Sequence, residues 1–217
     1  MALTKEETRD LYRRRAGRYG RSVQIYRLFG FDLERYRRDA ISTLALCPGD
    51  VVVELGCGTG LNFGHVQKAI GPEGKIIGVD LTDAMLDEAR NRVAREHWTN
   101  VELVHADLSE WQFPSGVSGV YSTLALTLVP EYDTIIERAS RALRPEGRLA
   151  ILDMREPSGW PPWLIRFAAW LNTPFGVSLD LAERRPWESI RRRLTETHYR
   201  EYYFGALYLC AGKKDDT

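Results

Sequence analysis

Short runs of apolar residues alternate along the chain with longer stretches in which apolar positions recur every three or four residues. The runs have the length and the β-branched content of buried strands, and the stretches between them have the period of amphipathic helices. The pattern predicts strands at 51–55, 75–79, 100–106, 119–124 and 149–153, separated by helices at 61–70, 82–96 and 131–143. Residues 143–148 are predicted to form the turn into the last of these strands. This alternation favours an α/β fold with a doubly wound, mostly parallel sheet.

The N-terminal part departs from this alternation. Residues 4–17 and 23–45 both have helical patterns rich in arginine and tyrosine. Thr4 and Glu7 have the spacing of a capping box at the start of the first helix. We expect these residues to form a helical cap that packs on the main domain.

The C-terminal part also has its own pattern. Residues 159–171 hold three tryptophans and a phenylalanine, and one helix face is formed by Trp163, Leu164, Phe167, Trp170 and Leu171. Residues 184–194 read as a basic helix. Strand-like runs at 199–204 and 206–211 flank Gly205. They predict an antiparallel hairpin that closes the sheet.

The stretch Val51–Gly60 carries the strongest functional signal. It reads VVVELGCGTG, an apolar strand followed by glycines at Gly56, Gly58 and Gly60. A turn of this kind before a helix exposes backbone N–H groups, and no Cβ keeps a ligand away from them. Asp80 follows twenty residues later at the end of the next strand, where a carboxylate can accept from the hydroxyls of a ribose. The arrangement indicates an adenosine-type site.

The spacing excludes two other nucleotide-binding turns. A dinucleotide fingerprint needs a third glycine or an alanine, but that position falls on Leu61 in one register and Phe63 in the other. A P-loop would end in Gly-Lys-Ser/Thr, which is absent here. Glu54 also closes the strand where a pyrophosphate site would avoid negative charge.

What remains is E-x-G-x-G-x-G from Glu54 to Gly60, which resembles motif I of the class I S-adenosylmethionine (SAM)-dependent methyltransferases. Three further stretches are similar to the ubiquinone/menaquinone C-methyltransferases, the UbiE-like family: Y-x-x-x-A-x-x-Y at 12–19, LRPEGRLAILD at 143–153 and YYFGALYLCAGKK at 202–214. Gly20 and Glu146 depart from the family pattern, which has Asp and Gly there. The resemblance implies a Rossmann-like methyltransferase fold with seven strands, SAM as cofactor and S-adenosyl-L-homocysteine as product.

The resemblance also implies which residues surround SAM. The two N-terminal tyrosines would close over its methionine end. Ser122 to Leu124, at the end of the fourth strand, should line the same end. Leu81 and Met85 would pack against adenine, although Met85 fits plain helix–sheet packing equally well. The expected cofactor-binding residues are Tyr12, Tyr19, Glu54, Gly56, Gly58, Gly60, Asp80, Leu81, Met85, Asp107, Leu108 and Ser122.

Asp107 and Leu108 also follow from position alone. They come at the carboxyl end of a predicted parallel strand, where ligands lie in such sheets. Asp107 can accept from the adenine amino group while the Leu108 N–H meets a ring nitrogen. The plainer alternative is that Asp107 is an N-cap or turn residue.

Composition and charge restrict the class of protein. The 217 residues are 44% hydrophobic and 28% charged, as in soluble globular proteins, and suffice for one domain. The start lacks a signal-peptide pattern, no apolar run approaches a membrane span, and three cysteines lack metal spacing. We therefore expect a cytoplasmic protein without a metal site.

The charge is unevenly distributed along the chain. Residues 1–40 carry a net charge of +5 and residues 183–200 a net +3, so the rest carries −8. We expect no nucleic-acid partner, while a basic edge could meet the inner surface of a membrane.

The chain is expected to divide within its single domain into a cap (1–46), a SAM-binding core (47–154), a variable substrate or lid region (155–197) and the closing hairpin (198–212). No Ser/His/Asp set or carboxylate pair stands in a suitable place, so the sequence assigns no catalytic residue. His198 or Tyr202 could act as a base if the hairpin borders the pocket. The oligomeric state stays open.

The acceptor is the least determined part of the prediction. The Trp-rich helix between basic segments favours a lipophilic acceptor, either a polyprenyl quinol precursor or an amino-headgroup phospholipid, and permits peripheral membrane contact. The same helix could instead form a pocket wall for a soluble small molecule, or a lid packed on the core. Two other classes remain: a nicotinamide-dependent oxidoreductase, disfavoured by the glycine spacing, and a SAM-binding protein without catalysis.

Overall fold

The computed structural model describes residues 4, 6–7, 9–14, 32–157, 159–161, 163, 165–166 and 183–216. Its strands are β1 (Val51–Leu55), β2 (Lys75–Asp80), β3 (Val101–His105), β4 (Val117–Thr123), β5 (Leu143–Met154), β6 (Thr195–Tyr202) and β7 (Leu207–Lys213). Its helices are α2 (Leu33–Ser42), α3 (Phe63–Ile70), α4 (Asp83–Arg95), the short 3-10 helix η2 (Leu126–Leu128), α5 (Tyr132–Ala142) and α7 (Pro186–Arg193). The predicted alternation of strands and helices is confirmed.

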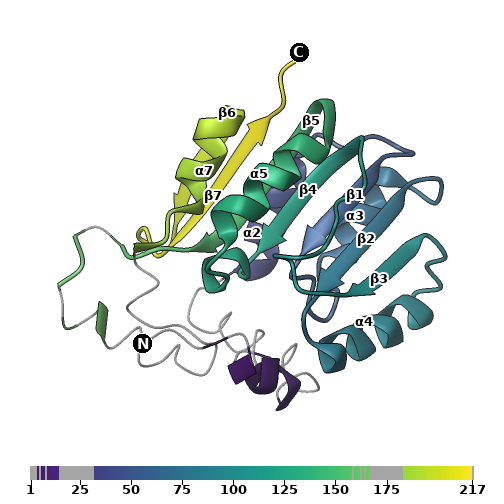
Figure 1. Ribbon diagram of the computed structural model, residues 1–217, viewed down its shortest axis with the longest axis horizontal. Helices are drawn as coiled ribbons and strands as arrows, with labels where there is room; N and C mark the ends of the chain where they lie inside the picture. Colours follow the sequence, from purple (N-terminus) through teal and green to yellow (C-terminus); the bar gives the residue numbers. More distant parts are fainter. Residues whose placement is uncertain are drawn as a thin grey trace.

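The seven strands form one sheet in the order β3-β2-β1-β4-β5-β7-β6 (Figure 1). β1 to β5 pair in parallel, whereas β7 lies antiparallel between β5 and β6. The predicted antiparallel C-terminal hairpin is therefore present. β1 has β2 on one side and β4 on the other, so the chain adds strands first to one side of β1 and then to the opposite side. In such folds ligands bind in the crevice beyond the carboxyl end of the strand at this switch point.

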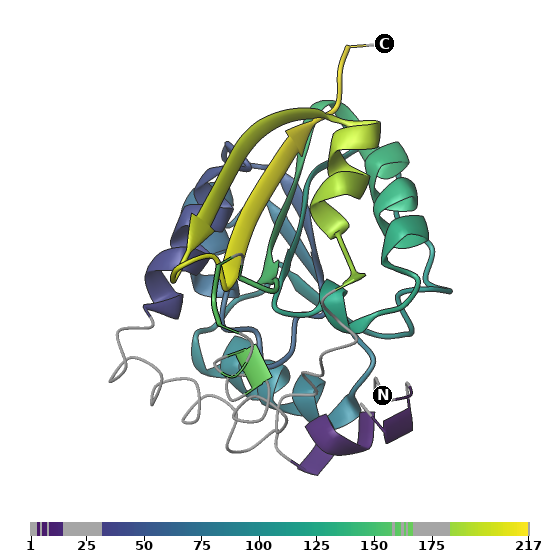
Figure 2. The same cartoon turned by 90° about the vertical axis from the view of Figure 1, so that its left-hand side faces the viewer.

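Helices cover both faces of the sheet (Figure 2). Residues of α2, α3 and α4 share one buried cluster with Val52 of β1, while residues of α5 and α7 share another with Val53. Adjacent strand residues point to opposite faces, so both must be apolar when both faces are covered. This is the physical reason for the uninterrupted VVV run in the sequence.

The described N-terminal residues begin as expected. Thr4 and Glu7 form the capping box, in which Thr4 N donates to Glu7 Oε2 (2.8 Å) and Glu7 N donates to Thr4 Oγ1 (3.2 Å). The second predicted helix, 23–45, is represented by α2, because residues 15–31 lie outside the described part of the chain. α2 ends at Ser42, three residues earlier than predicted, and Ala45 has a positive φ of 49°.

One predicted boundary is wrong. We expected a turn at 143–148 before the fifth strand, but β5 already begins at Leu143, which pairs with Val117. Glu146 takes the left-handed conformation (φ 62°), and its N–H donates to the Lys214 carbonyl (3.1 Å). The stretch is thus an irregular strand tied to the end of β7 rather than a free turn.

Most of the predicted Trp-rich helix lies outside the described residues, because 164 and 167–182 are among those left undescribed. Trp163 is described and is 68% exposed. The predicted basic helix corresponds to α7, which begins with Pro186 at its first turn. Across the part of the chain that the structure describes, no helix is long and apolar enough to cross a membrane.

Candidate functional site

A cavity that is open to solvent at its mouth lies beyond the carboxyl ends of β1, β2 and β4. Eight of the expected residues line it: Tyr12, Gly56, Gly58, Asp80, Leu81, Met85, Asp107 and Leu108. Glu54, Gly60 and Ser122 do not line it, and Tyr19 lies outside the described residues.

The three glycines of the turn have different structural reasons. All have positive φ, which glycine adopts at the lowest cost. A Cβ on Gly56 would come within 2.4 Å of the Ala125 Cβ, and one on Gly60 within 2.6 Å of the Phe63 ring. A Cβ on Gly58 would meet no atom within 4 Å, and Gly58 faces the cavity. Gly56 and Gly60 therefore permit close packing, whereas Gly58 leaves space open to a ligand.

Asp80 is held rigidly at the end of β2. Its Oδ2 accepts from Gly58 N (2.8 Å) and its Oδ1 from Thr82 N (2.8 Å). Burial raises the pKa of this carboxyl, while these N–H groups act in the opposite direction. A carboxylate oxygen can accept more than one hydrogen bond, so Asp80 can hold the turn and still accept from ligand hydroxyls.

Asp107 and Leu108 lie at the cavity wall next to β3. Asp107 Oδ1 accepts from Ser109 N (2.8 Å) and Ser109 Oγ (2.7 Å), so the plainer prediction of a turn-forming residue is met. Its position on the cavity also remains compatible with the adenine role. Met85 is compatible with both of its alternatives, because it is only 2% exposed in the core and also lines the cavity beside Leu81.

Glu54 lies behind the turn instead of at the cavity surface. It is fully buried and accepts from Tyr121 Oη (2.6 Å) and Asn62 Nδ2 (2.5 Å). Burial is the largest cause that raises its pKa, to about 7. Ser122 is also internal, and its Oγ donates to the Leu55 carbonyl (3.0 Å). Glu54 and Ser122 therefore lie behind the residues that line the cavity and support them.

The sequence interpretation missed two polar residues that line the cavity: Arg37 on α2 and Asn62 before α3. Thr123 and Leu124, which belong to the stretch 122–124 expected at the methionine end, do line it. Asn62 comes two residues after the last glycine of the turn, and Arg37 interrupts the apolar face of α2. These were the available signals. Neither indicates a ligand without knowledge of what lies opposite in space.

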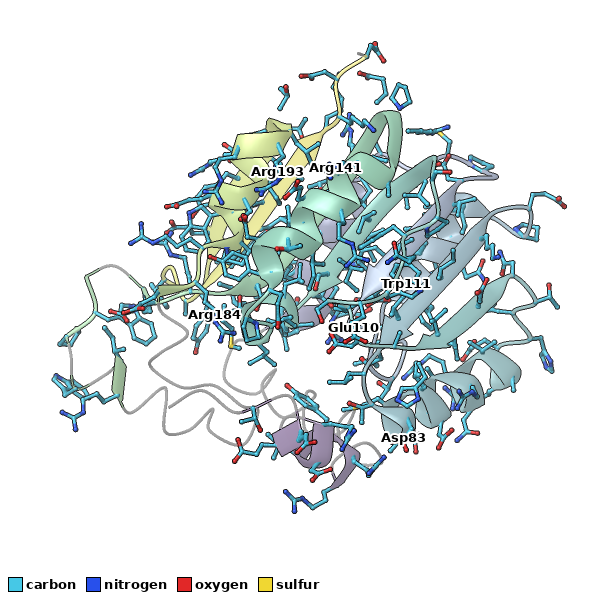
Figure 3. The ribbon with its side chains drawn as sticks, in the orientation of Figure 1. Asp83, Glu110, Trp111, Arg141, Arg184 and Arg193 are labelled. Atoms are coloured by element: carbon cyan, nitrogen blue, oxygen red, sulfur yellow. The ribbon has the colours of Figure 1, made fainter. Side chains whose placement is uncertain are left out.

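The N-terminal cap reaches the cavity through Tyr12. The next residue, Arg13, forms two hydrogen bonds with Asp83 at the start of α4, from Nε to Oδ1 (3.0 Å) and from Nη2 to Oδ2 (2.7 Å). Figure 3 shows Asp83 beside the N-terminal helical segment. The hydrogen bond from Arg13 is the main reason that the pKa of Asp83 falls to about 2, so the ion pair persists in neutral solution.

The segment after β4 forms an apolar wall composed of Leu124, Ala125, Leu128, Val129 and Pro130. Two polar contacts fix it: Thr127 N donates to Asp153 Oδ2 (2.9 Å), and Arg184 Nη1 donates to the Thr127 carbonyl (2.6 Å). Arg184 is labelled in Figure 3. The wall is therefore anchored to β5 and to the residues that precede α7.

Neither residue considered as a base lines the cavity. Tyr202 Oη donates to Asp39 Oδ2 (3.0 Å), and burial raises the Tyr202 pKa to about 12, so it is protonated at neutral pH. His198 lies on the edge strand β6, opposite Ala211. Among the described residues no group of three or more His, Cys, Asp or Glu side chains could hold a metal ion.

Comparisons with known proteins agree with this geometry. Residues 52–147 match the family model described as a methyltransferase domain. The chain is 29% identical over 182 residues to a demethylmenaquinone methyltransferase of Listeria monocytogenes, with 81% of this chain and 75% of that one covered. It is also 34% identical over 118 residues to an arsenite methyltransferase of Halobacterium salinarum. That alignment covers 54% of this chain and only 30% of the longer relative.

A solved structure has the same fold. It is geranyl diphosphate C-methyltransferase from Streptomyces coelicolor in complex with Mg²⁺, geranyl diphosphate and S-adenosyl-L-homocysteine. The two structures superpose with a TM-score of 0.66 at 15% identity, covering 83% of this chain and 79% of that one. This likeness shows the fold alone. The matched methyltransferase domain and the curated relatives indicate that the protein is a SAM-dependent methyltransferase, similar to the UbiE-like family.

Proposed function

We propose that SAM lies in the cavity with its ribose on Asp80 and its adenine between Leu81, Met85 and the Asp107–Leu108 corner. Support comes from the cavity itself, which brings these side chains to one wall while Gly58 leaves space beside Asp80. Tyr12 covers the site from the cap. SAM supplies a methyl group on a sulfonium that departs as a neutral thioether.

We further propose that the acceptor is a lipophilic molecule, namely the reduced, demethylated form of a polyprenyl quinone. The observation that carries this proposal is the apolar wall at 124–130, which extends the cavity past the end of β4. An aromatic ring and the first part of a prenyl tail can pack on such a surface. The name of the Listeria relative, demethylmenaquinone methyltransferase, supports the same class of acceptor.

The chemistry asks little of the side chains. In a quinol, the ring carbon next to an ionised hydroxyl is nucleophilic, forms the new C–C bond and afterwards loses its proton. The chain must align that carbon behind the methyl group and exclude water. An apolar wall without a dedicated base suits this task, since the nucleophile is activated by the acceptor's own hydroxyl.

Access to a lipid would take place at a membrane surface. Trp163 (68% exposed) and Phe204 (82% exposed) are the exposed large hydrophobic residues of the described chain. Aromatic side chains of this kind insert at the interface between headgroups and acyl chains. We propose that they contribute to peripheral contact with a membrane.

The test uses purified protein, methyl-labelled SAM and vesicles that contain a demethylated polyprenyl naphthoquinone kept reduced by dithionite. Label is expected in the organic phase, in the methylated quinone after chromatography. Asp80→Ala is the matched control and should abolish the transfer while the fold is retained. Label in a phospholipid of the vesicles would contradict the quinol proposal. So would label found only in the aqueous phase when a cell extract replaces the vesicles. No label in any fraction, with SAM bound, would indicate a protein that binds SAM without catalysis.

A further inference from the structure

The turn between β6 and β7 holds two aromatic residues in a conformation that such residues rarely adopt. Tyr203 and Phe204 both have positive φ (49° and 55°), and Gly205 N donates to the Tyr202 carbonyl (3.1 Å). These are the φ signs of a type I′ turn, whose two central positions strongly favour Asn-Gly, because bulky side chains are strained at positive φ. The chain therefore accepts backbone strain to place two aromatic rings at this hairpin tip (residues 203–205).

Packing within the chain does not offset this strain. Phe204 is 82% exposed, more than any other large apolar side chain among the described residues. Its ring contacts the Tyr203 ring edge-on, with the ring centres 5.8 Å apart. A strained backbone that leaves its side chain in water indicates a role outside the packing of the chain itself.

Two exposed arginines lie beside the hairpin tip. The Arg200 guanidinium is 5.1 Å from the centre of the Tyr202 ring. Burial is the largest cause that raises the pKa of Tyr202 to about 12, whereas the charges of Arg200 and Arg35 lower it, so both arginines are near this ring. Neither forms an ion pair within the part of the chain that the structure describes, while Asp39 accepts from the Tyr202 hydroxyl (3.0 Å). Unpaired positive charge thus flanks the aromatic tip.

The hairpin tip lies at the same edge of the sheet as the cavity (Figure 1). Met154, the last residue of β5, pairs with Leu207, the first residue of β7, and the tip lies just beyond this pair. Leu124, which follows β4 and lines the cavity, packs against the buried cluster that holds Tyr202 and Leu207. Apolar side chains therefore connect the cavity wall to the base of the tip.

We propose that the hairpin tip is the element by which the protein docks on an anionic lipid bilayer, with the Phe204 ring inserted below the headgroups and Arg35 and Arg200 at the lipid phosphates. Aromatic rings insert at the boundary between headgroups and acyl chains, and arginine binds phosphate through charge-assisted hydrogen bonds. The proposal rests on the lipophilic acceptor and the membrane contact proposed above. It adds where the contact is made, why the turn is strained and which lipid charge it meets.

A purely structural turn is the competing explanation, and the two explanations predict different stabilities. The double variant Tyr203→Asn/Phe204→Gly carries the favoured pair at the two positions of positive φ. If the tip serves docking, the melting temperature of this variant should equal or exceed that of the wild type, because strain is removed and little packing is lost. If the aromatic pair stabilises the hairpin, the melting temperature should fall.

The experiment measures cosedimentation with vesicles of phosphatidylcholine alone, or with about one third phosphatidylglycerol. The wild type should bind the anionic vesicles more tightly. Tyr203→Asn/Phe204→Gly should weaken binding to both kinds about tenfold, the scale of one aromatic side chain moved out of water. Arg35→Glu and Arg200→Glu should each weaken binding to the anionic vesicles about fivefold or more and spare the neutral ones. Arg95→Glu, the same charge change at the last residue of α4, is the matched control and should bind like the wild type.

Activity gives a second measurement. With methyl-labelled SAM, the double variant should raise the KM for a quinol embedded in anionic vesicles about tenfold, in proportion to the lost vesicle binding. Its SAM affinity and its kcat for a short-chain, water-soluble quinol should match those of the wild type, because the tip is outside the residues that line the cavity.

Three outcomes would overturn the docking surface: a lower melting temperature of the double variant, vesicle binding that it leaves unchanged, or a wild-type dimer that it dissociates in sedimentation velocity. The last would assign the tip to a second copy of the chain. If the wild type binds vesicles through the tip and transfers no label to a quinol, the docking surface is supported and the quinol proposal alone fails.

Discussion

Glu54 shows how a single residue combines structure and charge at this site. It ends β1 directly before the glycine turn and is completely buried, with Tyr121 and Asn62 as donors to its two oxygens. Arg37 opposes the pKa rise from desolvation, whereas the nearby Asp80 reinforces it. The position thus keeps a carboxyl whose ionisation falls near neutral pH.

The raised pKa predicts that the free energy of unfolding depends on pH, and that substituting Glu54 weakens this dependence. The pKa of Glu54 rises from its ordinary 4.5 to about 7 on folding, so the folded state holds the proton more tightly than the unfolded state. The stabilisation is fully present below pH 4.5 and is lost as pH rises through 7. The loss amounts to about 3 kcal/mol at most. In Glu54→Gln this part of the dependence should vanish.

Urea unfolding of both proteins between about pH 4.5 and pH 8 measures the effect as the slope of the free energy of unfolding against pH. Glu73→Gln, at an exposed position in the loop before β2, is the matched control and should keep the wild-type slope. Identical slopes for Glu54→Gln and wild type would show that Glu54 does not titrate in this range.

At the scale of elements, the strand–turn–helix unit from β1 to α3 contains two glycines with different roles, one in packing and one at the cavity. Gly56 and Gly58 both have positive φ (68° and 54°), but only Gly56 faces a neighbour, Ala125, at a distance too short for a Cβ. Its close approach joins the turn to the segment after β4. Gly58 instead borders the open cavity.

Alanine at these two positions should therefore have different consequences. Gly56→Ala should lower the free energy of unfolding by roughly 2–4 kcal/mol, because a steric clash adds to the backbone strain. Gly58→Ala should lower it by only about 1–2 kcal/mol, the cost of the left-handed conformation, but should weaken SAM binding because its methyl group enters the cavity. Thermal unfolding and SAM titration of both variants measure these effects. A larger stability loss for Gly58→Ala would contradict the assignment.

At the scale of the whole molecule, the N-terminal segment is joined to the core by a contact between residues 70 positions apart, Arg13 and Asp83. Both side chains are about half exposed, so the ion pair adds little to global stability. Its effect is local, because Tyr12 beside it lines the cavity. The contact is suited to hold the cap over a bound cofactor.

Arg13→Ala should accordingly raise the dissociation rate of SAM severalfold, while the melting temperature changes by no more than a few degrees. The expected reason is that Tyr12 is no longer held over the cavity. Stopped-flow displacement measures the rate, and Arg14→Ala, at an exposed neighbouring position, should leave it unchanged. Equal rates for Arg13→Ala and wild type would mean that the contact does not control release.

Much of the fold follows from local patterns in the sequence. The continuous VVV run, the glycine turn and Asp80 at the next strand end predicted the parallel core and one wall of the site, because strand order and ligand position follow general rules once β1, its turn and its helix are identified. The boundaries of β5 did not follow, since the Glu146 conformation depends on its hydrogen bond with Lys214, far away in sequence.

By itself, the sequence determined the class of fold, the glycine turn and the acidic residue expected to meet the ribose, because each depends on residues close together in the chain. Only the tertiary structure decided that Glu54 lies behind the cavity, that Tyr202 is paired with Asp39, and that Arg37 and Asn62 meet at one site. Asn62 and Thr123 are 61 residues apart, and their contact exists only because β4 lies next to β1. Local periodicity specifies which elements form, whereas the packing of distant elements specifies which side chains face the ligand.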